Sequence, residues 1–261
     1  MAFDPLKVSD HISSWLKSYA DTAKMDGFVL GVSGGIDSAV TATLCLLTGK
    51  PVCVVDLPIH QDPNELARSR ELCDSFSKRF SNITVLRVPL TEVYEATKDA
   101  LPDSIDFSDG LALANTRARL RMTFLYAIGA QRRSLVVGTG NKIEDFGIGF
   151  FTKYGDGGVD LSPIADLLKS EVYVLGRALE VPQSILEAAP TDGLWGDGRN
   201  DEDQIGASYA ELEIAMKFSE EKGDSNTLAG REKDVYAIYT RLNNANRHKM
   251  KPIPVCTIPR D

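Results

Sequence analysis

Apolar positions in the first half of the chain follow two alternating patterns. Short apolar runs typical of buried strands lie at residues 28–32, 52–57, 83–88 and 134–138. Segments with the 3.6-residue spacing of helices lie between them, at residues 39–47, 64–79 and 111–130. Strands that alternate with helices form a parallel sheet with helices on both faces. We therefore expect an α/β fold with a Rossmann-like, doubly wound parallel sheet.

The two ends of the chain have patterns of their own. Apolar residues from Val8 to Tyr19 recur at helical spacing, which predicts an amphipathic helix over about residues 5–24. Residues 243–261 are rich in proline and basic side chains, so we expect an extended tail laid over the body. No internal repeat or linker divides the sequence, and we expect a single domain over residues 1–261.

Two stretches fit neither pattern. They run from Lys142 to about Pro163 and from Pro190 to Gln204, and both contain several glycines. Loops of this length without regular structure are usually functional or disordered. For the second stretch, the acidic composition is equally consistent with a mobile lid and with a solvated surface loop.

Residues 33–38 read Ser-Gly-Gly-Ile-Asp-Ser and join the first predicted strand to the helix that follows. A glycine-rich turn at a helix N-terminus binds phosphate, because the backbone approaches the ligand closely and presents unpaired N–H groups. The loop has neither the lysine of a Walker A sequence nor the G-x-G-x-x-G of a dinucleotide loop. An ordinary turn capped by Ser33 or Asp37 is the alternative. We favour a pyrophosphate-binding loop, since an ordinary turn needs neither paired glycines nor two serines.

The position of this loop predicts where the ligand site lies. The loops after Val32, Leu57 and Val137 all follow predicted parallel strands, so they meet beyond the carboxyl edge of the sheet, where such folds bind ligands. Because the phosphate loop has no lysine, a metal and basic residues elsewhere must neutralise the phosphate charge. Asp37 supplies a carboxylate for that metal.

Composition and charge narrow the class of protein. The chain has 261 residues, 43% of them hydrophobic, and a formal charge of −8, which argues against a nucleic-acid coat. No stretch approaches the roughly 20 apolar residues of a membrane span, and the start lacks the pattern of a secretory signal. We therefore expect a cytoplasmic protein without membrane or nucleic-acid partners. The four cysteines match no C-x-x-C pair, so we expect reduced thiols, without zinc or disulfides.

Several charged residues are candidates for chemistry. Arg117, Arg119 and Arg121 alternate on a predicted helix and cannot share one face, so one of the last two is expected to meet a phosphate or carboxylate. Glu144 could join Asp37 in an oxygen shell for Mg²⁺, with Asp145 as its rival. A charge at a helix start is the structural alternative for both acids.

Two lysines and a histidine are further basic residues of interest. Lys153 and Lys169 could neutralise phosphate charge, although most lysines lie on the surface. His248 lies beside Lys249 in the basic segment, and an exposed histidine with no role is its structural alternative.

With these residues in place, the chain resembles the short, ammonia-dependent NAD synthetases, within the wider group of ATP-pyrophosphatase-type enzymes. The loop at 33–38 is shared by the wider group, whose fold is described as adenine nucleotide alpha hydrolase-like. The string Phe-Thr-Lys-Tyr-Gly-Asp-Gly-Gly-Val-Asp at 151–160, following Gly-Thr-Gly-Asn-Lys at 138–142, is what points to this family. The resemblance extends from about residue 9 to the end.

The resemblance implies a reaction and a set of site residues. The family makes NAD from deamido-NAD: ATP adenylates the nicotinate carboxylate, pyrophosphate leaves, and ammonia displaces AMP. The resemblance implies that ATP is bound by Gly31, Val32, Ser33, Gly34, Gly35, Ile36, Asp37, Ser38, Thr139, Lys169 and Thr191. It implies that deamido-NAD is bound by Arg119, Lys153, Asp160, His248 and Lys249, and Mg²⁺ by Asp37 and Glu144. As catalytic residues we expect Asp37, Lys169 and Asp156; that Asp156 receives the ammonium ion is our own inference.

Two further expectations follow from the resemblance, together with one departure from it. We expect ammonia as the direct nitrogen source, without a glutaminase domain, and a symmetric homodimer to which the N-terminal helix contributes. The segment between Glu144 and Phe151 is one residue longer than in some members, which leaves Glu144 and Asp145 as alternative metal ligands. Another amidating or tRNA-thiolating enzyme of the same loop group, or a non-catalytic nucleotide-binding module, is the alternative function.

Overall fold

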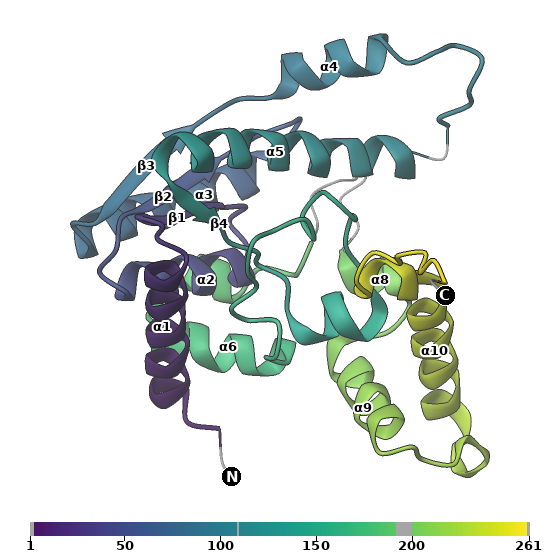
Figure 1. Cartoon of the computed structure of the whole chain (residues 1–261). Coiled ribbons are helices and arrows are strands. Elements are labelled where there is room, and N and C mark those ends of the chain that lie inside the picture. The colour runs from purple at the N-terminus through teal and green to yellow at the C-terminus, as the bar shows by residue number, and fades with distance from the viewer. Residues whose placement is uncertain (1–2, 109, 192–199, 260–261) are drawn as a thin grey trace.

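Four parallel strands form the centre of the computed structural model, which describes residues 3–108, 110–191 and 200–259 (Figure 1). Across the sheet the strands follow the order β3-β2-β1-β4. They are β1 (Gly27–Gly31), β2 (Val52–Asp56), β3 (Ile83–Arg87) and β4 (Ser134–Val136). β1 is central and pairs with β2 on one side and β4 on the other. The loops that leave β1 and β4 therefore lie side by side at the carboxyl edge.

Helices cover both faces of this sheet. One face carries α1 (Pro5–Thr22), α2 (Ile36–Leu47), α3 (Pro63–Arg79), α6 (Lys169–Ala178) and the short α7 (Gln183–Leu186). The other face carries α4 (Thr91–Asp99) and α5 (Leu111–Arg132), drawn above the strands in Figure 1.

Alternating side chains along the strands explain the two layers. Phe28 and Leu30 in β1 pack with the α2 side, whereas Val29 between them packs with Met122 and Leu125 of α5. Side chains alternate between the faces of a strand, so a run that is apolar at every position must be covered twice. The predicted doubly wound α/β fold is confirmed.

A third group of helices packs beside the sheet rather than on it. It consists of the π-helix η1 (Lys142–Ile148), α8 (Asp201–Ile205), α9 (Tyr209–Glu220), the 3₁₀ turn η2 (Ser225–Thr227) and α10 (Gly230–Met250). Its apolar core, which includes Ile143, Leu212 and Tyr239, is separate from the two cores at the sheet. We call α8, α9 and α10 the C-terminal helical cluster.

Two segments differ from the sequence prediction. The stretch predicted to be irregular from Lys142 begins with the π-helix η1. Of the stretch at 190–204, residues 192–199 lie outside the described residues, and Asp201–Ile205 form α8.

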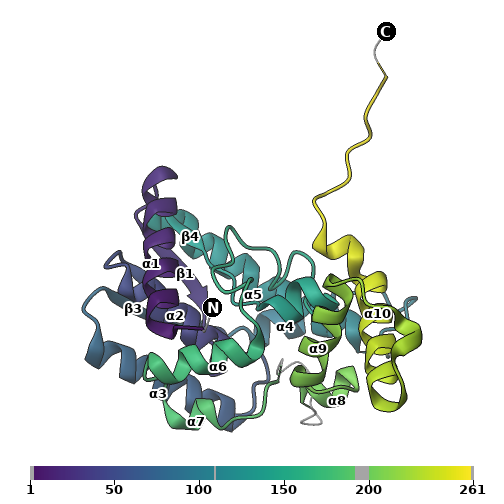
Figure 2. The same ribbon diagram turned by 90° about the horizontal axis from the view of Figure 1, so that it is seen from below.

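The prediction of an extended tail from residue 243 is wrong for its first eight residues, which complete α10. Asn243 and Asn246 donate side-chain hydrogen bonds of 2.8 Å to the carbonyl oxygens of Gly147 and Ile148, which fastens the polar end of the helix to η1. The first proline, Pro252, comes after the helix has ended. From Lys251 the chain is extended, but it projects away from the body instead of lying over it (Figure 2).

The remaining expectations concern the start of the chain, membranes and cysteines. The helix expected at about 5–24 is α1, which buries Ile12 and Leu16. Among the described helices, none has both the length and the apolar character that a membrane crossing requires. Cys45, Cys53 and Cys73 are buried free thiols, and Cys256 is an exposed one.

Candidate active site

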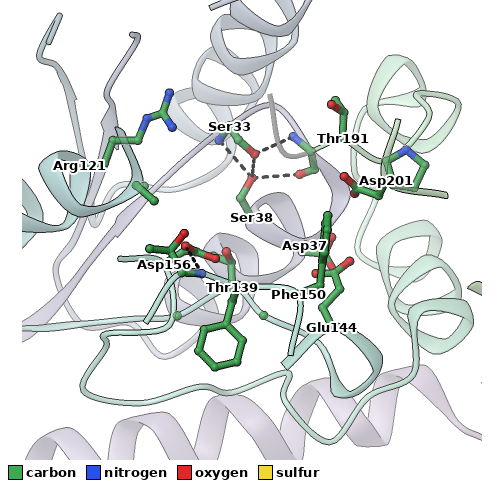
Figure 3. A pocket seen from close by; sticks show the side chains of 18 of the residues that line it. Ser33, Asp37, Ser38, Arg121, Thr139, Glu144, Phe150, Asp156, Thr191 and Asp201 are labelled. Atoms are coloured by element: carbon green, nitrogen blue, oxygen red, sulfur yellow. Dashed lines mark hydrogen bonds between the residues drawn. The ribbon is translucent and has the colours of Figure 1, made fainter. Parts of the chain in front are cut away.

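A cavity of about 830 Å³ opens at the carboxyl edge of the sheet (Figure 3). Residues 31–38 line it together with Thr139, Lys169 and Thr191, so every residue predicted to bind ATP contributes to one cavity. Figure 3 shows Asp37, Glu144 and Asp201 on one side and Arg121 with Asp156 on the other.

The phosphate loop can be formed only with glycine at position 34. Gly34 has φ of +80°, and a β-carbon there would lie 2.8 Å from the carbonyl oxygen of Glu65 and 2.9 Å from the amide of Ser69. Gly35 then caps α2 with extended backbone and no side-chain bond, which leaves the first N–H groups of the helix facing the cavity. An anion at this point meets backbone donors and the positive end of the helix dipole.

The two loop serines hold this conformation. The hydroxyl of Ser38 donates to the carbonyl oxygen of Gly35 at 3.0 Å, and the amide of Gly35 donates to the Ser33 hydroxyl at 3.2 Å. Both hydroxyls lie 3.3 Å apart. The paired serines therefore organise the loop before a ligand arrives.

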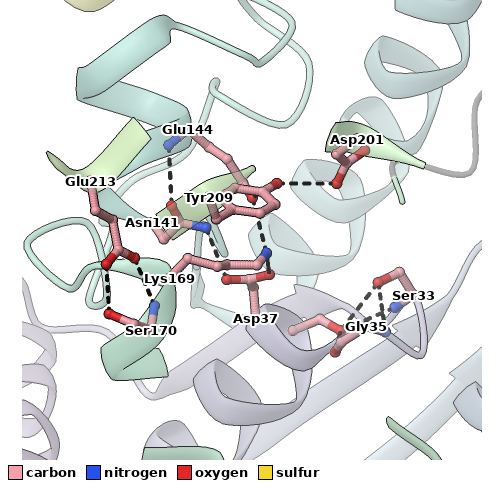
Figure 4. A network of polar contacts seen from close by, with 11 residues as sticks. Ser33, Gly35, Asp37, Asn141, Glu144, Lys169, Ser170, Asp201, Tyr209 and Glu213 are labelled. Atoms are coloured by element: carbon pink, nitrogen blue, oxygen red, sulfur yellow. Dashed lines mark hydrogen bonds and ion pairs between the residues drawn. The ribbon is translucent and has the colours of Figure 1, made fainter. Parts of the chain in front are cut away.

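Two carboxylates share one lysine beside the loop (Figure 4). The Nζ of Lys169 lies 2.6 Å from Oδ2 of Asp37 and 3.0 Å from Oε1 of Glu144. Asp37 is in the first turn of α2, Glu144 is in η1, and Lys169 is the first residue of α6. The amide of Asn141 donates to Asp37 at 3.1 Å. Three segments far apart in the sequence thus form one charged centre.

Burial and pairing set the protonation states of this centre. Burial alone would lower the pKa of Lys169, but Asp37 and Glu144 outweigh it, so the pKa is raised and the side chain stays an ammonium. Burial likewise opposes ionisation of Glu144, but Lys169 and the Tyr209 hydroxyl lower its pKa below the usual range. For Asp37, burial dominates and raises the pKa.

The arrangement fits a divalent cation that arrives with phosphate oxygens. Asp37 and Glu144 face one cation, the Lys169 ammonium, from two sides. Within the described residues, no group of three or more His, Cys, Asp or Glu side chains could hold a metal. Mg²⁺ commonly takes one or two protein carboxylates and completes its octahedron with water and phosphate. Two carboxylates beside a phosphate loop match that requirement.

Asp145, the rival of Glu144, lies elsewhere in the cavity. A β-carbon on Gly140 would overlap its carboxylate, so Asp145 occupies the space left by that glycine. Burial, together with Glu144, Asp156 and Asp37, raises the pKa of Asp145 to about 8. Glu144 contacts Lys169 and Asn141, as Asp37 does, which favours Glu144 over Asp145 as the second carboxylate of the charged centre.

The glycine-rich segment at 151–160 forms the opposite wall. The amide of Thr152 donates to Asp156 at 3.0 Å, and burial raises the pKa of the Asp156 carboxyl. Lys249 at the end of α10 donates to the carbonyl oxygen of Phe151 at 2.7 Å. Asp156 therefore lies in the same cavity as the phosphate loop, with Lys249 nearby.

The basic residues predicted for deamido-NAD gather at this end. Arg119, Lys153 and Lys249 line the large cavity and also a second one of about 580 Å³. Arg119 donates to the carbonyl oxygen of Lys153 at 3.2 Å, and Lys153 donates to that of His248 at 3.2 Å. His248 lines the large cavity.

Asp160 is placed differently from these basic residues. Its carboxylate accepts hydrogen bonds from the hydroxyl of Tyr126 at 3.1 Å and from the amide of Val136 at 2.8 Å. These contacts join the glycine-rich segment to α5 and β4.

The three arginines of α5 make separate contacts, although Arg119 and Arg121 both line the large cavity. Arg117 stacks over Tyr94 at 4.9 Å, while Arg121 donates to the carbonyl oxygen of Leu57 at 3.0 Å and to Gln61 at 2.8 Å. Burial lowers the pKa of Arg121 to about 10.

Sequence reasoning missed Asn141, Tyr209 and Asp201. Asn141 lies in the segment Gly-Thr-Gly-Asn-Lys at 138–142. Its position two residues after Thr139 was the signal from which a place in the site could have been predicted. Tyr209 begins an amphipathic helix and reads as an ordinary core residue; it packs in the core of the C-terminal helical cluster. Nothing in the sequence alone places its hydroxyl beside Glu144, because 65 residues separate the two.

A doubly wound sheet with a lysine-free phosphate loop and paired carboxylates defines a nucleotide-binding α/β enzyme. The family model described as NAD synthase matches residues 8–253. The chain is 35% identical to an NH₃-dependent NAD⁺ synthetase from Methanosarcina acetivorans over 95% of this chain and 97% of the relative. It is 39% identical to one from Mesoplasma florum over 79% of this chain and 82% of that protein.

Solved structures agree with these relatives. The NMN synthetase from Francisella tularensis superposes with a TM-score of 0.84 at 31% identity, covering 98% of this chain and 100% of the other. An NH₃-dependent NAD synthetase from Campylobacter jejuni gives a TM-score of 0.78 at 25% identity, with the same coverage of both chains. The chain belongs to the NAD synthase family.

Proposed function

We propose that this enzyme makes NAD from deamido-NAD, with ATP and ammonia as co-substrates and AMP and pyrophosphate as products. The observation that carries the proposal is the Asp37–Lys169–Glu144 centre beside the phosphate loop, in one cavity with a cationic far end. Membership of the NAD synthase family supports the same reaction.

The first chemical step is adenylation. A nicotinate carboxylate oxygen attacks the α-phosphorus of ATP, and the bond between that phosphorus and the oxygen bridging to the β-phosphate breaks. Lys169 and the N–H groups at the start of α2 stabilise the negative charge that develops on the leaving pyrophosphate, because preorganised donors need no rearrangement during the reaction. When bound, Mg²⁺ would neutralise phosphate charge, and Asp37 and Glu144 are the residues that would hold it.

The second step is amide formation. Ammonia attacks the carbonyl carbon of the acyl-adenylate, the bond to AMP breaks, and one proton is released from nitrogen. Asp156 lies in the same cavity as the phosphate loop and is suited to receive ammonium and present it as ammonia. Arg119, Lys153, His248 and Lys249 supply cationic and hydrogen-bonding groups for the phosphates of deamido-NAD.

A second candidate substrate is the corresponding mononucleotide. The Francisella tularensis structure that matches 98% of this chain is described as an NMN synthetase. The same cavity chemistry would serve either acid, because both carry the nicotinate carboxylate. The two substrates differ in the number of phosphates that the cationic end of the cavity would bind.

We also propose that the enzyme is a cytoplasmic homodimer. Trp15 and Tyr19 of α1 are 41% and 43% exposed and their ring centroids lie 5.7 Å apart, which leaves an aromatic surface on the helix expected to contribute to the interface.

An end-product assay tests the proposed reaction. With ATP, ammonium and Mg²⁺ present, the purified protein is incubated with deamido-NAD or with nicotinate mononucleotide, and nucleotides are separated by chromatography. We expect AMP and pyrophosphate, without ADP, and higher kcat/KM with deamido-NAD. Formation of ADP and phosphate would contradict the mechanism, and higher kcat/KM with the mononucleotide would favour the second substrate. Glutamine in place of ammonium is expected to give almost no product.

A further inference from the structure

Tyr209 is the first residue of α9, and it contacts the charged centre without lining the phosphate loop. Its hydroxyl lies 2.5 Å from Oε1 of Glu144 and 3.2 Å from Oδ2 of Asp201 (Figure 4). The side chain is 6% exposed, so water does not compete freely for the hydroxyl. A hydrogen bond from a neutral hydroxyl to a buried carboxylate is among the stronger kinds in proteins.

Hydrogen bonds around the start of α9 fix the position of Tyr209. Ser208 caps the helix, and Glu211 accepts the Ser208 amide at 2.8 Å. Arg231 of α10 donates to both carboxylate oxygens of Glu211, at 2.7 and 2.8 Å. Glu202 of α8 accepts the backbone amide of Tyr209 at 2.8 Å. All three elements of the C-terminal helical cluster therefore fix this one residue.

The hydroxyl carries one proton and lies between two carboxylates. The shorter distance indicates that the hydroxyl donates its hydrogen bond to Glu144. The same Oε1 atom of Glu144 also accepts a hydrogen bond from Lys169 at 3.0 Å. The ring lies beneath the same ammonium, with Nζ of Lys169 4.8 Å from the ring centre. One oxygen of Glu144 is thus held by two donors, and the orientation of the carboxylate is fixed by groups from α6 and α9.

We propose that Tyr209 is a positioning residue that orients the Glu144 carboxylate for the magnesium–ATP complex. This inference rests on the proposed role of Glu144 as a metal ligand. Tyr209 acts through Glu144 and supplies no group to the reacting atoms. The C-terminal helical cluster thereby takes part in assembling the nucleotide site, although its core is separate from the cores at the sheet.

The test compares Tyr209→Phe with Tyr239→Phe. Both tyrosines are buried in the core of the C-terminal helical cluster, at 6% and 5% exposed, and of the two it is Tyr209 that contacts Glu144. The probe is Mn²⁺ with α,β-methylene-ATP, which cannot be cleaved at the reacting bond, and binding is measured by electron paramagnetic resonance of free Mn²⁺. The concentration of Mg²⁺ for half-maximal activity and kcat are measured separately.

We expect Tyr209→Phe to weaken Mn²⁺ binding about 10-fold or more, since loss of a partner that orients a metal ligand typically costs 10- to 100-fold in metal affinity. The half-saturating Mg²⁺ concentration is expected to rise with it, and Tyr239→Phe is expected to leave both quantities at wild-type values. Binding of the ATP analogue without metal is expected to stay unchanged in both variants. Equal thermal unfolding midpoints of the two variants would confirm that the difference is not one of folding.

A third variant, Glu144→Gln, separates the two hypotheses. If Glu144→Gln weakens Mn²⁺ binding and Tyr209→Phe does not, the positioning role is wrong while the proposed function stands. If neither variant changes Mn²⁺ binding, Glu144 is not the metal ligand, and the inference about Tyr209 is overturned with that assignment.

Discussion

At the scale of single residues, Lys169 lies between the two carboxylates that we propose to hold a divalent cation. The ammonium lies within 3.0 Å of both Asp37 and Glu144, and only 4% of its side chain is exposed. An ammonium and a metal cannot both occupy this gap. We therefore expect the Lys169 ammonium to compete with the divalent cation that we propose to accompany ATP.

Lys169→Met tests this competition. Loss of the charge is expected to leave two buried carboxylates without their counter-ion, lowering stability by about 3–5 kcal/mol. Added Mn²⁺ should then raise the thermal unfolding midpoint of the variant more than that of the wild type, in the absence of nucleotide. The variant should lose about 3–4 kcal/mol of transition-state stabilisation, as for loss of one preorganised charge contact, and kcat should fall accordingly.

Lys153→Met is the matched control, since Lys153 lines the same cavity but contacts the carbonyl oxygen of His248. Its unfolding midpoint should respond to Mn²⁺ as the wild type does. An equal response of Lys169→Met and wild type would contradict the competition.

Asp145 makes the stability of the fold depend on pH. Its pKa is raised to about 8 by burial and by Glu144, Asp156 and Asp37. The folded chain then keeps a proton that the unfolded chain releases near pH 4, so this residue lowers stability as pH rises from about 4 to about 8. Above about pH 8, the Asp145 carboxyl is ionised in both the folded and the unfolded chain, so its effect on stability no longer changes with pH.

Asp145→Asn should remove this dependence. One pKa unit corresponds to about 1.4 kcal/mol, and partial screening reduces the total, so we expect a gain of about 1–3 kcal/mol in the free energy of unfolding at pH 8. The gain should be small at pH 4. Denaturant unfolding at several pH values measures it, with Asp166→Asn as the control because that side chain is 99% exposed. A gain that did not grow with pH would exclude this explanation.

At the scale of elements, α10 and the segment after it contribute separately to the cationic end of the cavity. α10 supplies His248 and Lys249, whereas the extended segment supplies Lys251, Pro252 and Ile253 to the second cavity. The hydrogen bonds of Asn243 and Asn246 to η1 hold the end of α10 without help from the extended segment.

Two shortened chains distinguish these contributions. Ending the chain at Met250 should keep α10 and weaken deamido-NAD binding by about 1 kcal/mol or less, whereas ending it at Asn246 removes the Lys249 contact with Phe151 and should cost about 2–3 kcal/mol. ATP binding should change little in both. Calorimetric titration with each ligand measures the effect, and equal losses of ATP and deamido-NAD binding would contradict it.

The elements that sequence patterns predicted are those whose burial is regular. Phe28, Val29 and Leu30 are apolar on consecutive positions because helices cover both faces of β1, and the run is visible without a structure. The end of α10 gave no such signal, because it is fastened through the side-chain amides of Asn243 and Asn246 rather than through apolar contacts.

The candidate site divides in the same way. The phosphate loop, Asp37 and Thr139 follow strands, so topology alone places them at one edge. Lys169 and the glycine-rich segment stood out by charge and composition, but the family resemblance was needed to assign them to the ligand sites. Tyr209 could not be predicted, because its distance from Glu144 depends on how the C-terminal helical cluster docks, and no periodicity encodes that docking.

At the scale of the whole molecule, the exposed aromatic pair on α1 predicts self-association. Trp15→Glu places a charge in the surface that we propose to be buried between two subunits, and burying an unpaired charge is costly. We expect wild-type protein to have the mass of a dimer by light scattering and the variant to dissociate at concentrations where the wild type does not. Lys17→Glu, on the same helix at an exposed position, is the control. A monomeric wild type would refute the proposal.

The pairing of Asp37 with Lys169 also has a consequence for the order in which the molecule is made. The sheet is complete once residue 136 has been synthesised, but Asp37 lies 132 residues before Lys169, and Tyr209 comes 65 residues after Glu144. Contacts between residues so far apart close late, because the loops between them must first lose their freedom. During synthesis, the loop at 33–38 is therefore made well before Lys169 and Tyr209, which complete the charged centre.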